Sequence, residues 1–228
     1  MLQRILLTSR QVFAVGHDVP LRHEQSLTWK YYSPIQANDL QTSAMQAKRQ
    51  SDFADAVLTS TVLVGVLFLV LGVELAFRLP LNQYGILPRT RIGVLGIVFS
   101  PLLHANMSHL VANAIPLLVL LVVLLSDRKY HPYRTLALVW VASGLGTWLI
   151  GRGQAVHIGA SSIIFGLAAF LIVAGLLMKT WRSLAIAILV IVFYGGIFYG
   201  VLPQAGPISW EGHLCGAVAG VWTARSLA

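Results

Sequence analysis

Charged residues are scarce in this sequence: only 11% of its 228 residues are Asp, Glu, Lys or Arg, whereas 57% are hydrophobic. Soluble domains carry about 25% charged residues, and the mean hydropathy of this chain is high, at +0.75. Too few polar side chains are available to cover a surface in contact with water. The composition therefore excludes an ordinary soluble domain and predicts an integral membrane protein whose surroundings are a lipid bilayer.

The sequence also lacks the residues that most cofactor sites require. Cys215 is its one cysteine, so no disulfide can form within the chain, and we expect a buried structural thiol. No Cys and His spacing suits zinc, and no glycine-rich loop suits a phosphate group. We therefore expect no metal and no cofactor. The short run Ile5-Leu6-Leu7 is not long enough for the hydrophobic part of a secretory signal.

The chain divides into a polar N-terminal part, residues 1–55, and an apolar remainder, residues 56–228. We expect the first part to be a cytoplasmic extension, because it is too short and too polar to hold a large core. The remainder contains six apolar segments: about 56–77, 109–125, 135–150, 161–178, 184–201 and 212–228. Several of them fall slightly short of the about 20 helical residues that cross a bilayer core. The prediction is an all-α membrane protein, a bundle of six transmembrane helices.

Basic residues in the connections orient this bundle. One side carries a large set of them: Arg4, Arg10, Arg22, Lys30, Lys48, Arg49, Arg128, Lys129, Arg134, Lys179, Arg182 and Arg225. The other side carries a small set: Arg78, Arg89, Arg91 and Arg152. The positive-inside rule then places both termini in the cytoplasm and Ser161 on the outer side. The formal net charge is +8, but the basic residues lie at the ends of apolar segments, where membrane topology explains them better than nucleic acid binding does, so we expect no nucleic acid partner.

The connection between the first two apolar segments, residues 79–108, is long and contains an apolar stretch over residues 92–103. An ordinary aqueous linker is the simplest interpretation, but the hydrophobicity of this connection argues against it. We expect the connection to lie in the membrane interface, or to enter the membrane where protein covers its backbone.

Polar residues gather in three clusters, all at the predicted outer ends of apolar segments: residues 104–113, 157–166 and 210–220. In the first cluster His109 and Asn113 are four residues apart and share a helix face. In the third, His213, Gly216 and Gly220 share a face that has no bulk beyond the histidine. Small residues of this kind let two membrane helices approach closely.

If the glycine face packs against the helix that begins at Ser161, the imidazole of His213 can reach the Ser161 hydroxyl, which places a nucleophile beside a base. Phe165, one turn further along, would limit the orientations of the imidazole. His109 and Asn113 could then donate to an oxyanion, together with the Ser161 amide. The simpler alternatives are that Ser161 or Ser162 only caps its helix and that His213 only hydrogen-bonds between helices.

At these residues the chain resembles the rhomboid intramembrane serine proteases. The matching pattern is His104-x4-His109-x3-Asn113, then Gly159-x-Ser161, then His213-x2-Gly216-x3-Gly220. The resemblance covers about residues 56–228 and implies a six-helix rhomboid-like protease domain. It implies that Ser161 is the nucleophile and His213 the general base, with no metal. His109, Asn113 and the Ser161 amide would form the oxyanion site, supported by His104, Phe165, Gly159, Gly216 and Gly220.

The sequence departs from the family pattern at two places. Many members carry a Trp-Arg pair in the first outer connection, where this chain has Leu87-Pro88-Arg89-Thr90-Arg91. Ser162 stands where glycine is commonest after the nucleophile.

The expected function is that of an intramembrane serine endopeptidase in a bacterial cytoplasmic (inner) membrane. Its substrates would be single-span or multi-span membrane proteins, cleaved in transmembrane segments near the outer face by a Ser-His dyad. Glu211 would not be a third catalytic member, since residues two apart on a helix point to opposite sides. One alternative is a non-catalytic rhomboid-like protein that binds membrane helices for quality control. Another is a small transporter, which would require acidic residues within the spans.

Overall fold

The computed structural model describes residues 34–204, 206 and 208–227. The chain divides into two units, and the larger one, called the compact unit below, spans Lys48–Ala228. Most of the predicted N-terminal extension, residues 1–33, lies outside the described residues. Helix α1 spans Pro34–Phe77, so it begins well before the apolar run that starts near residue 56. Proline is favoured at the first position of a helix because its fixed φ suits the helix and its missing N–H has no partner there.

The remaining helices are α2 (Gly93–Phe99), α3 (Met107–Leu125), α4 (Pro132–Ile150), α5 (Ser161–Leu177), α6 (Trp181–Tyr194) and α7 (Trp210–Leu227). Short 3-10 helices, η3 to η6, lie at Leu81–Tyr84, Ser100–Leu102, Arg128–Tyr130 and Gly195–Val201. Every predicted apolar segment is therefore helical, and no strand occurs among the described residues beyond an isolated bridge between Ile86 and His157. The chain is all-helical, as predicted.

Two helical stretches, Gln41–Phe77 and Met107–Leu125, are long and apolar enough to cross a membrane by length and composition. Shorter apolar helices lie at Gly93–Leu102, Ser161–Leu177 and Trp181–Tyr194. The helical nature of the six segments is thus established, whereas the count of six spans stays a prediction.

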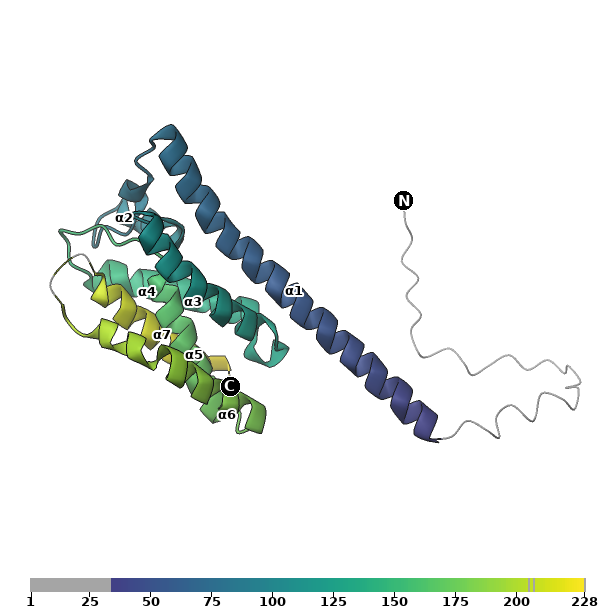
Figure 1. Cartoon of the computed structure of the whole chain (residues 1–228). Coiled ribbons are helices and arrows are strands. Elements are labelled where there is room, and N and C mark those ends of the chain that lie inside the picture. The colour runs from purple at the N-terminus through teal and green to yellow at the C-terminus, as the bar shows by residue number, and fades with distance from the viewer. Residues whose placement is uncertain (1–33, 205, 207, 228) are drawn as a thin grey trace, which may run out of the picture. The chain divides into compact units, whose positions relative to one another are not determined.

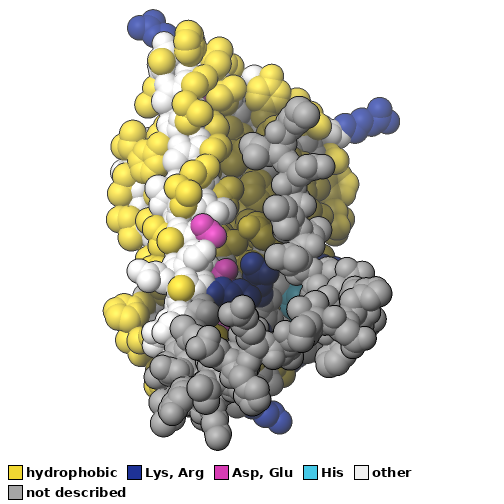
Figure 2. All heavy atoms as spheres, turned by 90° about the vertical axis from the view of Figure 1, so that its right-hand side faces the viewer, with side chains coloured by type: hydrophobic (Ala, Val, Ile, Leu, Met, Phe, Trp, Pro, Cys, Tyr) yellow, Lys and Arg dark blue, Asp and Glu magenta, His cyan; other side chains and the backbone are white. Residues whose placement is uncertain are grey.

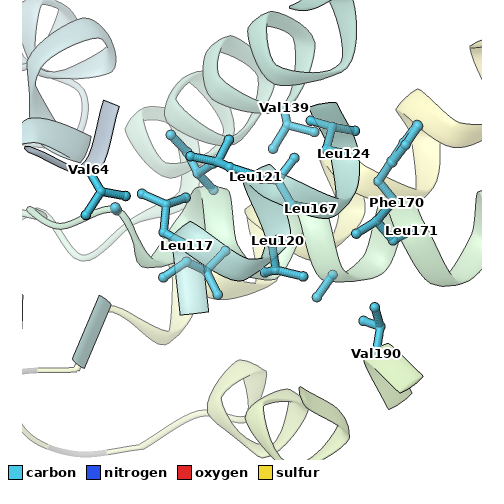
Figure 3. Packing of buried hydrophobic residues seen from close by; sticks show 14 of the residues in the cluster. Val64, Leu117, Leu120, Leu121, Leu124, Val139, Leu167, Phe170, Leu171 and Val190 are labelled. Carbon is cyan, nitrogen blue, oxygen red and sulfur yellow. The ribbon is translucent and has the colours of Figure 1, made fainter. Parts of the chain in front are cut away.

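Helix α5 is the centre of the compact unit, packed against α3, α4, α6 and α7 (Figure 1). Its side chains from Ile163 to Leu171 are buried on all sides, which explains why this stretch shows no polar face, whereas Leu176 and Leu177 at its end are exposed. Figure 3 shows the resulting core, in which leucines of α3 pack against α5. The labelled residues are Val64, Leu117, Leu120, Leu121, Leu124, Val139, Leu167, Phe170, Leu171 and Val190.

The described surface of the unit exposes many large apolar side chains. On α6, Val192 is 69% exposed and Phe193 is 75% exposed. Figure 2 shows one face on which hydrophobic side chains cover much of the described surface. Soluble monomers rarely expose apolar patches larger than a few hundred Å², so this surface suits contact with lipid.

Helices α5 and α7 meet backbone to backbone. A Cβ atom added at Gly216 would overlap the carbonyl of Ser162, and one added at Gly220 would overlap the carbonyl of Gly166. The glycine face predicted from the sequence is therefore packed against α5. This contact brings the N-terminal ends of the two helices together.

We expect Gly220→Ala to destabilise the protein by about 1–3 kcal/mol, because the new methyl overlaps backbone that cannot rotate away. Gly72→Ala in α1 is the matched control, since a Cβ there meets nothing within 4 Å. Removing the backbone freedom of that glycine should raise stability by about 0.5–1 kcal/mol. Thermal unfolding in detergent measures both changes, and equal shifts of the two variants would contradict the close contact.

Candidate active site

Ser161 is the first residue of α5, and its side chain does not cap the helix. The N-cap is Ala160, which makes no side-chain capping hydrogen bond. The Ser161 hydroxyl instead lies 3.0 Å from Nε2 of His213. The interpretation of Ser161 as a simple cap is therefore wrong, because the hydroxyl faces a different helix.

The imidazole of His213 is held at both of its nitrogens. Its Nδ1 lies 3.0 Å from the carbonyl oxygen of Gly200, in η6. A carbonyl oxygen only accepts hydrogen bonds, so Nδ1 carries the proton and donates it. Nε2 is then left with a lone pair that accepts from the Ser161 hydroxyl, which is the tautomer that a general base requires.

Phe165 lies parallel to the His213 ring, with the ring centroids 4.1 Å apart and an interplanar angle of 8°. Phe198 packs edge-on against Phe165, at 6.2 Å. Gly200 leaves room for both rings, since a Cβ there would lie 2.8 Å from Phe165 Cζ and 3.2 Å from His213 Nδ1. The imidazole plane is thus fixed by stacking as well as by hydrogen bonds.

The start of α3 brings His109 and Asn113 to the same place. Both line a pocket of about 580 Å³ that Ser161 and His213 also line. The amide of Asn113 donates to the His109 carbonyl at 2.9 Å, which leaves its second N–H available. Asn106 caps α3 by accepting from the His109 amide at 2.9 Å, so the first turn of the helix is well defined.

Gly159 and His104 shape the turn that precedes Ser161. Gly159 has a φ of +109°, a conformation that side chains disfavour. A Cβ there would also lie 2.9 Å from His109 Nε2. His104 is fully buried, and its Nε2 accepts from the amide of Ala160 at 3.5 Å. Burial, with His109 as a second cause, lowers the pKa of His104 to about 4, so the ring is neutral and able to accept at neutral pH.

The connection between α1 and α3 is anchored without a Trp-Arg pair. Nη1 of Arg89 donates to the carbonyls of Leu149 and Gly151, both at 2.9 Å, at the C-terminal end of α4. Trp148 of α4 donates from Nε1 to the Thr90 carbonyl at 2.9 Å. An arginine and a tryptophan therefore still anchor this connection, but they belong to two different segments.

Three features of the site have no clear signal in the sequence. The Gly200 carbonyl is a backbone group, so no residue type marks it. Arg152 was noted only as a basic residue of the outer side, yet it forms an ion pair with Glu211 at 2.6 Å. His157 lies within the predicted central cluster, and its Nδ1 is 2.6 Å from the Ser209 hydroxyl.

Among the residues that the structure describes, no group of at least three His, Cys, Asp or Glu side chains could hold a metal ion.

Comparison with known proteins bears on the family of this chain. A family model of the rhomboid domain matches residues 92–228. The uncharacterized protein Rv1337 of Mycobacterium tuberculosis (strain ATCC 25618 / H37Rv) is 41% identical over 195 residues, which cover 82% of this chain and 81% of that protein. The uncharacterized protein ML1171 of Mycobacterium leprae (strain TN) is 42% identical over 180 residues, which cover 75% of this chain and 70% of that protein.

A more distant relative is the "Putative rhomboid protein L523" of Acanthamoeba polyphaga mimivirus, 29% identical over 152 residues, which cover 63% of this chain and 79% of that protein. No solved structure matches the chain. The family model covers more than half of the sequence, and the two mycobacterial proteins are similar over most of their own length. The chain belongs to the rhomboid family.

Proposed function

We propose that this protein is an intramembrane serine endopeptidase that cleaves transmembrane segments of other membrane proteins near the outer face of the membrane. The observation that carries the proposal is the 3.0 Å contact between His213 Nε2 and the Ser161 hydroxyl, with Nδ1 held by the Gly200 carbonyl. A hydroxyl beside a correctly oriented base is the arrangement that nucleophilic catalysis requires. Membership of the rhomboid family, whose members are generally intramembrane proteases, supports the same activity.

In the proposed reaction the Ser161 oxygen attacks the peptide carbonyl carbon while its proton passes to His213 Nε2. His109, Asn113 and the Ser161 amide donate to the oxyanion of the tetrahedral intermediate. The intermediate collapses, and the leaving amine takes the proton from Nε2, which leaves an acyl group on Ser161. Water then gives a proton to Nε2 and attacks the acyl carbon. Release of the acid product returns the proton to Ser161.

The start of α5 adds a further stabilising effect. Ser161 is the first residue of this helix, where the amides of the first turn have no partners within the helix. The positive end of the helix dipole therefore faces the position at which negative charge develops. The pocket of about 580 Å³ beside Ser161 would admit both the peptide and water.

The same proposal places residues 56–228 in the membrane as the protease domain, with residues 1–55 and both termini in the cytoplasm. The scarcity of charge and the exposed apolar side chains of α6 support an integral membrane protein. The mycobacterial relatives support a bacterial cytoplasmic membrane. The substrates would be single-span or multi-span membrane proteins.

The alternative of a non-catalytic helix-binding protein does not require a paired serine and histidine. Here both residues are present, in contact and supported by Phe165, which favours the protease. The transporter alternative requires acidic residues within the spans. Glu74 lies near the end of α1 and accepts from the Asn82 side chain at 2.8 Å, which favours a structural role.

Ser161→Ala and His213→Ala should each abolish cleavage of a single-span substrate in detergent, because nucleophile and base have separate roles. A fluorophosphonate probe should label the parent protein and not the Ser161 variant. Ser162→Ala is the matched control and should keep both cleavage and labelling. Cleavage by the Ser161→Ala variant at the parent rate would overturn the proposal.

Asn113→Ala should lower kcat by about 10²-fold, because one oxyanion donor is lost, whereas KM should change little. Asn113 is 5% exposed, so thermal unfolding must be measured in parallel to separate lost chemistry from lost folding. An unchanged kcat in a folded variant would show that Asn113 does not contact the oxyanion.

Gly200→Ala should lower kcat on the order of 10²-fold, since the new methyl displaces the His213 ring from its aligned position. Gly196→Ala in the same 3-10 helix is the control, because a Cβ there meets nothing within 4 Å. Steady-state kinetics of the two variants provide the measurement. Similar activity of both variants would contradict the role of Gly200 in holding the imidazole.

A further inference from the structure

An ion pair between a partly exposed arginine and a buried glutamate joins the end of α4 to the start of α7. Arg152 directly follows Gly151, the C-cap of α4, and Glu211 lies in the first turn of α7. Nε of Arg152 lies 2.6 Å from Oε1 of Glu211, whose side chain is only 2% exposed. A buried carboxylate is costly unless a cation compensates it, so the position of Glu211 depends on Arg152.

The same guanidinium also holds the chain that leads into α7. Nη2 of Arg152 donates to the Ile208 carbonyl at 2.6 Å, and Nη1 donates to the Gly206 carbonyl at 3.4 Å. Three nitrogens of one planar group thus contact three acceptors on the same segment. Arginine provides such a fork, whereas lysine provides a single charged centre.

Ser209 links this segment to both the pocket and the catalytic histidine. Its carbonyl accepts from the His213 amide at 3.1 Å, in the first turn of α7. Its hydroxyl lies 2.6 Å from Nδ1 of His157, which is itself paired through its backbone with Ile86. The placement of residues 208 and 209 therefore affects where the helix that carries His213 begins.

This segment is also part of the wall of the active-site pocket. Arg152, Ile208 and Ser209 line the pocket of about 580 Å³ that contains Ser161 and His213. Glu211 is directed at Arg152, whereas His213 Nδ1 is bonded to Gly200. Among the residues that the structure describes, the side chains of Arg152 and Glu211 form no hydrogen bond or ion pair with the side chains of Ser161 and His213.

We infer that Arg152 and Glu211 are positioning residues of the proposed protease. Their ion pair fixes the first turn of α7, together with residues 206, 208 and 209, and so holds His213 and one wall of the pocket in the geometry of the reaction. This inference rests on the proposed function for its effect on turnover. The contact between the two segments is independent of that function and is testable separately.

The single substitutions of Arg152 and Glu211 should lower kcat to different extents. Arg152→Ala leaves a buried carboxylate without its cation and should lower kcat on the order of 10²-fold. Glu211→Gln replaces the carboxylate with a neutral side chain of the same size and should cost no more than about 10-fold. The double variant should recover about 10-fold relative to Arg152→Ala, since no uncompensated charge remains. Arg91→Ala, at an exposed arginine of the outer connection, is the control and should retain the parent rate.

These two single variants and the double variant distinguish the positioning role from two alternative roles. If Glu211 were a third catalytic member, Glu211→Gln would lose as much activity as His213→Ala, and the double variant would not recover. If Arg152 bound the substrate directly, Arg152→Ala would raise KM with little change in kcat. Either result would overturn the positioning role.

Hydrogen exchange of the amides of residues 208–213 gives a readout that does not depend on proteolysis. It is measured for the parent, Arg152→Ala, Glu211→Gln and the double variant, each in a Ser161→Ala background. Faster exchange in Arg152→Ala, partly reversed in the double variant, supports the inference, and equal exchange in all four overturns it. The parent protein could also fail to cleave any substrate while Arg152→Ala still speeds hydrogen exchange and the double variant partly reverses it. This result would overturn the proposed function but support the contact between the two segments.

Discussion

The close approach of α5 and α7 is the constraint on which the rest of the site depends. Gly216 and Gly220 place the backbone of α7 directly against the carbonyls of Ser162 and Gly166. Backbone atoms cannot rotate away as side chains can, so the distance between the two helices has little freedom. Ser161 is at the start of one helix and His213 at the start of the other, and their 3.0 Å contact follows from this packing. Without a strong hydrophobic force between helices in lipid, such packing supplies much of the association.

A second constraint acts at the end of the bundle that holds Ser161, where the connections satisfy many of their backbone groups by hydrogen-bonding to one another. The Gly159 amide donates to the Ser100 carbonyl at 2.8 Å, and Ile86 exchanges backbone hydrogen bonds with His157. Arg89 satisfies two carbonyls at the end of α4. These bonds tie the connection before α3 to the turn before Ser161. The pocket therefore has walls that belong to three separate parts of the chain yet are linked through the backbone.

The sequence predicted the helices well, because apolar runs of this length leave few alternatives. It also predicted that the clusters around His109, Ser161 and His213 would meet, because all of them fall at the ends of apolar segments on one side. It did not predict the start of α1 at Pro34, since polar residues carry no signal of hydrophobic burial. The Gly200 carbonyl and the partner of Glu211 were also missed. Both depend on tertiary contacts between distant residues, which neither composition nor periodicity encodes.

The group that orients His213 has a physical advantage in this setting. In many serine hydrolases a carboxylate accepts from the equivalent nitrogen, but a carboxylate within a membrane protein must be compensated or it is costly. The Gly200 carbonyl fixes the same tautomer without adding a charge. The nearby carboxylate of Glu211 forms an ion pair with Arg152, which compensates its charge. The orientation of His213 and the compensation of the Glu211 charge are thus provided by different groups, so different substitutions test them.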